Sequence, residues 1–140
     1  MCWNVFLASE SPLPTTEPWN PEAPTFSVTK PGPRDQEIRA QFKHPHMVVL
    51  GSHTQCGCGF FDEDEGPSDP RRETVRRLVA YLEEALLDSP ELELFACWEG
   101  GECDPPPAQR LQLRPGDFSA ERFPVGDDSS TTPGYARIAL

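Results

Sequence analysis

The sequence predicts an α+β domain: a mostly antiparallel sheet of about six or seven strands, with one main helix at about 70–87 packed on it. Two observations lead to this class. Several short segments alternate apolar and polar side chains with a period of two, as half-buried strands do. A stripe of apolar residues with helical spacing runs only through residues 70–87. A sheet covered by that helix is therefore expected.

The expected strands are short and are separated by turns that contain proline or glycine. In the first strand, Val5 and Leu7 share one face. In the strand at 91–98, Phe95 and Cys97 face away from the two leucines. In chain order the main expected strands are 2–8, 37–42, 46–50, 91–98 and 110–114, and the shorter candidates are 26–28, a brief return strand at 60–61, and 135–140.

The helix has a recognisable beginning and end. Asp69 is a good N-cap residue, and Pro70 suits the first helical position. The helix ends at Asp88-Ser89-Pro90. The apolar stripe that should pack on the sheet consists of Val75, Leu78, Val79, Leu82, Ala85 and Leu86.

The length and composition indicate one domain, residues 1–140, with long Pro-rich loops at about 9–24 and 99–109. A chain of 140 residues can bury enough surface for a single core. Its 17 prolines and 10 glycines make up about a fifth of the sequence, well above ordinary usage. Long ordered loops around a small core are therefore expected.

The charge and hydropathy of the chain exclude several classes of partner. A net charge of −11 disfavours binding to nucleic acid, which requires clustered Lys and Arg, and to an anionic membrane surface. We expect the acidic run 62–65 to be a solvated turn. No apolar run approaches the ~18 residues of a membrane span, and no secretory signal is recognisable. We therefore expect a cytoplasmic protein whose five cysteines do not form a disulfide framework.

The segment from Gly51 to Phe60 is the strongest candidate for a site. It places Cys56 and Cys58 two residues apart between glycines, with His53 three residues upstream. Two thiolates on one zinc ion lie about 3.8 Å apart. Side chains at i and i+2 of a regular strand are roughly 6.5 Å apart. The segment must therefore curl if both sulfurs are to bind one metal.

A thiophilic metal (zinc, iron or copper) is the ligand that this grouping favours, because sulfur is a soft ligand. His53, Cys56 and Cys58 provide three ligands, and a complete site needs a fourth. Cys97 is the first choice, His46 and Cys103 come next, and His44 and Cys2 follow. The sequence therefore predicts metal ligands among His46, His53, Cys56, Cys58 and Cys97.

Two other functional classes remain open. The first is a small thiol-dependent enzyme or redox protein that uses Cys56 and Cys58, with a histidine lowering a thiol pKa. The second is an interaction module that uses the Pro-rich loop and Trp19, with cysteines that are only structural. In a variant of the first class, removal of Met1 exposes Cys2 as a nucleophile. That arrangement is similar to N-terminal-nucleophile amidohydrolases, although their arginine and Asn-Gly substrate-binding motifs are missing.

The chain also resembles a group of small bacterial proteins to which no activity is assigned. The resemblance rests on the Met1-Cys2 start, Leu7-Ala8-Ser9, Pro45-His46 and the segment Gly-Ser-His-x-x-Cys-Gly-Cys-Gly-Phe at 51–60. The resemblance implies that residues 51–60 belong together as one motif. It indicates no reaction and no substrate.

Overall fold

The structure is a computed structural model that describes residues 2–61, 70–99, 111–119, 121–125 and 133–140. Six strands in these residues form one sheet with the order β2-β3-β1-β4-β6-β5. Neighbouring strands are antiparallel except for β5 and β6, which are parallel. The predicted α+β class, with a mostly antiparallel sheet, is confirmed. The strands are β1 (Trp3–Ser9), β2 (Ser27–Thr29), β3 (His46–Gly51), β4 (Leu92–Trp98), β5 (Leu111–Leu113) and β6 (Gly134–Ile138).

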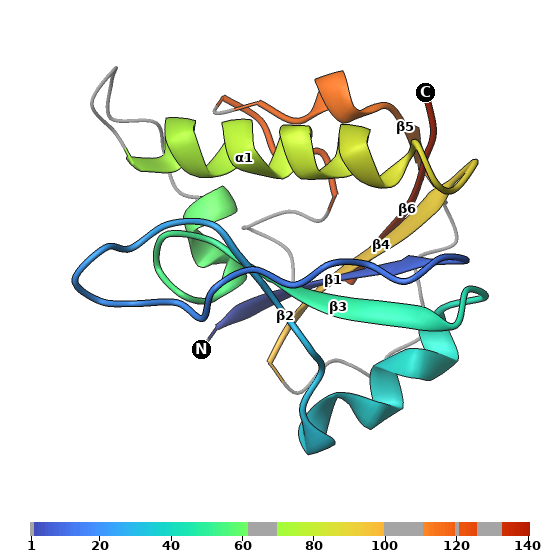
Figure 1. The fold of residues 1–140 in the computed structure, drawn as a ribbon, viewed down its shortest axis with the longest axis horizontal. Helices are drawn as coiled ribbons and strands as arrows, with labels where there is room; N and C mark the ends of the chain where they lie inside the picture. The colour runs from blue at the N-terminus through green and yellow to red at the C-terminus, as the bar shows by residue number, and fades with distance from the viewer. Residues whose placement is uncertain (1, 62–69, 100–110, 120, 126–132) are drawn as a thin grey trace.

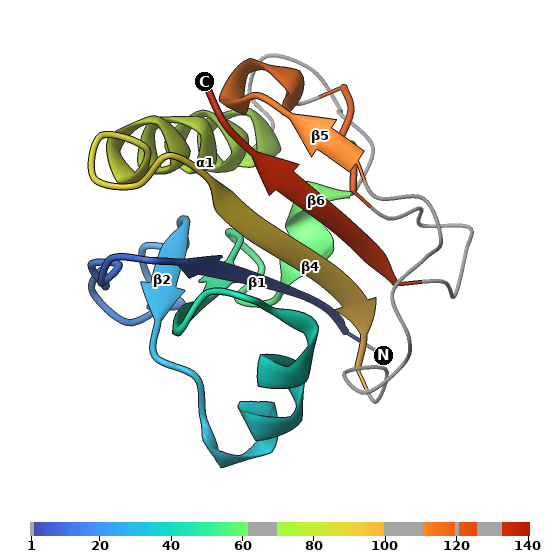
Figure 2. The same ribbon diagram turned by 90° about the vertical axis from the view of Figure 1, so that its right-hand side faces the viewer.

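The two faces of the sheet have different covers. The helix α1 (Pro70–Ala85) lies on one face, and the 3-10 helix η1 (Pro33–Gln41) lies on the other, as Figure 1 shows. Figure 2 shows the strands side by side beneath α1. Val5 and Leu7 of β1 pack in the larger core with Leu78 of α1, whereas Phe6 and Cys97 belong to the smaller core on the opposite face. The predicted alternation of the strand faces is therefore confirmed.

The main helix begins at Pro70 and ends at Ala85, followed by a turn to Asp88. Val75, Leu78 and Leu82 of the predicted stripe are buried. The helix combines a buried apolar stripe with an exposed charged face, as expected for a helix packed on a sheet. Neither this helix nor any other in the described ranges has the length and apolar character required to cross a bilayer.

Two of the predicted strands are wrong. Residues 37–42 fall mainly in η1, where the turn at Gly32 and Asp35 begins a helical segment: the Asp35 carboxylate accepts the Gly32 N–H at 2.7 Å. Their alternation misled because Ile38 is buried while Ala40 is exposed. Residues 60–61 end a second 3-10 helix, η2 (Gly57–Phe60), rather than forming a return strand.

Several sequence predictions concern residues beyond the described ranges, so they stay predictions. They are the Asp69 cap, the acidic run 62–65, Arg110 and most of the loop at 99–109, including Cys103.

A buried carboxylate fastens the turn before β3 to the sheet. Glu93 of β4 is 2 % exposed and accepts the backbone N–H groups of Lys43 at 2.9 Å and His44 at 2.7 Å. It also accepts the hydroxyl of Tyr135. Burial and this hydrogen bond raise the pKa of Tyr135 to about 12. His44, a late choice among the predicted metal ligands, is buried, and Nε2 of its imidazole lies 3.1 Å from a carboxylate oxygen of Glu91.

Candidate functional site

The chain reverses direction immediately after β3, and this reversal builds the candidate site. The backbone N–H of Ser52 donates to the carbonyl of Cys56 at 3.0 Å, and its hydroxyl donates to the same oxygen at 2.6 Å. Gln55 takes a positive φ of 79° within this turn. Cys56 then caps η2 at its start. The segment is therefore curled, as chelation or any other joint action of the two sulfurs requires.

Glycine is required in this segment because the backbone approaches its neighbours closely. A Cβ on Gly57 would lie 2.7 Å from Cγ2 of Val5 and 2.8 Å from the carbonyl oxygen of Trp3. A Cβ on Gly59 would lie 2.7 Å from Cε1 of His53. These separations are shorter than ordinary carbon contacts, so a side chain at Gly57 would force the loop away from β1, and one at Gly59 would displace His53.

Polar side chains fix the inside of the loop and tie it to α1. The hydroxyls of Ser52 and Thr54 lie 2.9 Å apart, and both accept the backbone N–H of Gly59. The backbone N–H of His53 donates to the Thr74 hydroxyl of α1 at 3.2 Å, and Nδ1 of the imidazole lies 3.1 Å from the same oxygen. Hydrogen bonds thus hold the loop together internally and attach it to α1.

Three thiols meet where this loop rests on the start of β1. Cys56 makes side-chain hydrogen bonds with both Cys2 and Cys58. The backbone N–H of Trp3 donates to Sγ of Cys58 at 3.2 Å. Cys2 is exposed, whereas Cys56 and Cys58 are half-buried, and none of the three is in a disulfide. The group joins the beginning of the chain to a loop more than fifty residues later.

The three thiols do not ionise alike. Burial opposes ionisation of Cys56, but hydrogen bonds from Cys58, Thr54 and Cys2 outweigh it, so the pKa of Cys56 is lowered. The Thr54 hydroxyl lies 3.7 Å from Sγ of Cys56. Burial, followed by the interactions with Cys56, raises the pKa of Cys58 to about 11. The hydrogen bond and the charge of Cys56 raise the pKa of Cys2. Of the three thiols, Cys56 is therefore the one whose ionisation is favoured.

The other predicted ligands lie elsewhere. Cys97 is fully buried in the smaller core, on the face of the sheet opposite the core that Cys58 contacts. His46 starts β3, so about five residues at 3.3 Å separate it from the loop that follows Gly51. His53 bonds Thr74 rather than a cysteine in the residues that the structure describes. Over those same residues, no group of three or more His, Cys, Asp or Glu is arranged to hold a metal ion.

The sequence pattern places Cys2 last among the predicted ligands and indicates no role for Thr54. The strand at 2–8 and the strand at 46–50 were both recognised, but their pairing was not. The observed antiparallel register places Val5 opposite Leu50, which brings the start of β1 to the end of β3. That pairing is the signal that would have put Cys2 beside Cys56.

Comparison of the chain with models of protein families, with curated proteins and with solved structures finds no match. The resemblance to small bacterial proteins stays a prediction.

Replacement of Gly57 by alanine should destabilise the protein by about 2 kcal/mol, because the new methyl group overlaps Val5 and the Trp3 carbonyl. Gly116→Ala is the matched control, since a Cβ there meets nothing within 4 Å. Urea unfolding of the two variants measures the difference. Equal stability of both variants would show that Gly57 does not lie in close contact with Val5 and Trp3 of β1.

Alkylation by iodoacetamide should modify Cys56 faster than Cys2 or Cys58 near pH 7, because its lowered pKa gives it the largest thiolate fraction. Thr54→Val should shift the midpoint of the rate profile for Cys56 to higher pH, since one hydrogen bond to the thiolate is lost. Thr54→Ser, which keeps the hydroxyl, should leave it nearly unchanged. Peptide mapping at a series of pH values gives these rates, and equal profiles for all three variants would refute the role of Thr54.

Proposed function

We propose that the protein is a small thiol–disulfide redox protein in which Cys56 is the reacting thiolate. The observation that carries the proposal is the grouping of Cys56 with two other thiols, Cys2 and Cys58, where the loop packs on the start of β1. A thiolate with a lowered pKa attacks disulfides, and an adjacent thiol then completes the exchange. The loop supplies the reacting thiolate of Cys56, and the second thiol comes either from the loop (Cys58) or from the residue before β1 (Cys2).

The exchange has two steps. The Cys56 thiolate attacks one sulfur of a substrate disulfide, a mixed disulfide forms, and the other substrate sulfur leaves as a thiolate that takes a proton. A neighbouring cysteine then loses its proton to solvent and attacks the sulfur of Cys56, which releases the second substrate thiol. The substrate disulfide gains two electrons and the protein dithiol loses them, giving a protein disulfide and two substrate thiols.

Cys2 is the better candidate for the second thiol. Its pKa is raised chiefly by Cys56, through the hydrogen bond and then the charge. Both effects disappear once Cys56 is in a mixed disulfide, so Cys2 then ionises more easily. The pKa of Cys58 is raised first by burial, which persists. Its sulfur is also held by the backbone N–H of Trp3. The state of Cys56 therefore controls the reactivity of Cys2.

Oxidation of the reduced protein by glutathione disulfide tests the proposal. Non-reducing peptide mapping should find a disulfide between Cys2 and Cys56. Cys2→Ser should stop at a mixed disulfide of glutathione on Cys56, because the second thiol is absent. Cys58→Ser, the matched control, should still close the disulfide. Failure of Cys56 to react contradicts the function, whereas closure in Cys2→Ser but not in Cys58→Ser contradicts the assignment of Cys2.

A thiophilic metal site, which the sequence predicts, is the second candidate function: Cys56 interacts with both Cys2 and Cys58, although the described residues form no group of three or more ligands arranged to hold a metal ion. Soft thiolate ligands select zinc, copper(I) or the iron of sulfur clusters. Elemental analysis of the same reduced protein separates the two candidates. About one equivalent of metal, lost in Cys56→Ser, would support this candidate, and less than about 0.1 equivalent after supplementation would remove it.

A further inference from the structure

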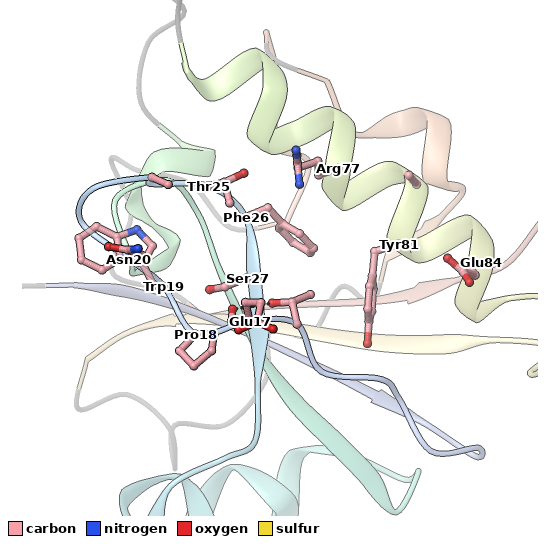
Figure 3. A pocket seen from close by; sticks show the side chains of 13 residues that line it. Glu17, Pro18, Trp19, Asn20, Thr25, Phe26, Ser27, Arg77, Tyr81 and Glu84 are labelled. Carbon is pink, nitrogen blue, oxygen red and sulfur yellow. Dashed lines mark hydrogen bonds between the residues drawn. The ribbon is translucent and has the colours of Figure 1, made fainter.

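A pocket of about 640 Å³ lies between the Pro-rich loop and α1, apart from the three thiols. Figure 3 shows Trp19 and Phe26 contributed by the chain from 16 to 27, with Arg77, Tyr81 and Glu84 contributed by α1. The volume falls in the range of sites for small ligands. Three aromatic side chains among the lining residues provide apolar walls.

The walls of the pocket are fixed to the rest of the domain without a ligand. The indole N–H of Trp19 donates to the carbonyl of His53 at 3.0 Å, and the hydroxyl of Tyr81 donates to the carbonyl of Pro14 at 2.8 Å. The hydroxyl of Thr16 accepts the backbone N–H of Val28 at 2.9 Å. The Pro-rich loop is thus anchored on its own domain. A pre-formed pocket loses little conformational entropy when it binds.

The charges around the pocket favour a cation. Glu17 and Glu84 are exposed carboxylates at its rim. Arg77 is the only basic residue in the lining, and its Nε–H already donates to Glu73 at 2.9 Å. Burial, followed by the charge of Glu84, raises the pKa of Tyr81, so the negative potential reaches the aromatic wall. Carboxylates beside aromatic faces are the chemistry that recognises organic cations.

We propose that this pocket binds an organic cation, a guanidinium or ammonium group on an apolar stem. The aromatic side chains of Phe26 and Tyr81, whose ring centroids are 5.9 Å apart, contact the stem and the cation, and Glu84 and Glu17 neutralise its charge. The group can belong to a free amine or to a basic side chain of a peptide. The binding does not depend on the thiol chemistry proposed above, because none of the three cysteines lines the pocket.

Titration of the full chain with acetyl-Gly-Arg-Gly-amide, followed by NMR of the Tyr81 ring resonances, tests the proposal. The neutral citrulline analogue should bind at least about fivefold more weakly. Spermidine serves as the free amine: tighter binding of spermidine assigns a free-amine ligand, and tighter binding of the peptide assigns a basic side chain. Absence of a shift with both cations, or equal affinity for arginine and citrulline peptides, overturns the proposal.

Matched variants distinguish binding in the pocket from a general effect of the protein's net charge. Glu84→Gln should weaken binding of the arginine peptide about fivefold. Glu83→Gln makes the same charge change one residue earlier, where the side chain lines a different hollow with Val79 and Phe118, and should have little effect. An equal loss of affinity in both variants would show that binding depends only on the net charge of the protein, and it would overturn the proposed site. Binding of acetyl-Gly-Glu-Gly-amide instead, abolished by Arg77→Gln, would also contradict the proposal, since the pocket would then select anions.

Discussion

Close contact between the loop after β3 and the start of β1 is the constraint on which the candidate site depends. A side chain at Gly57 would lie 2.7 Å from Val5 and 2.8 Å from the Trp3 carbonyl, so only glycine permits this approach. The contact allows the backbone N–H of Trp3 to reach Sγ of Cys58. It also brings Cys2 to Cys56. Without it, the loop would carry two thiols and the start of the chain a third, with no interaction between them.

The fold could be predicted largely from local patterns because most of its elements have one buried face. Alternation in β1 and β4 correctly separated Leu7 from Phe6 and Leu94 from Phe95. The same rule failed at residues 37–42, where the turn at Gly32 begins a 3-10 helix and only Ile38 is buried. Short apolar patterns do not distinguish a strand from a short helix that buries a single residue.

The site could be predicted only in part. Its centre, Cys56 and Cys58, was apparent from the sequence because glycines flank a pair of close cysteines. The third thiol was not, because its position follows from the long-range pairing of β1 with β3. Cys97 was favoured because it projects from a strand, yet local alternation does not say which face of the sheet the loop will cover. The grouping of side chains from distant segments is a property of the fold rather than of any one motif.

The proposed thiol chemistry requires Cys2, Cys56 and Cys58 to ionise as a coupled group in which Cys56 loses its proton first. A pH titration of the reduced protein, with ¹³C-labelled cysteine Cβ atoms observed by NMR, measures this directly. We predict that Cys56 titrates below the ordinary thiol range of about 8.5, and that the signals of Cys2 and Cys58 respond to the same step. Three independent titrations, each near the ordinary value, would contradict the central claim.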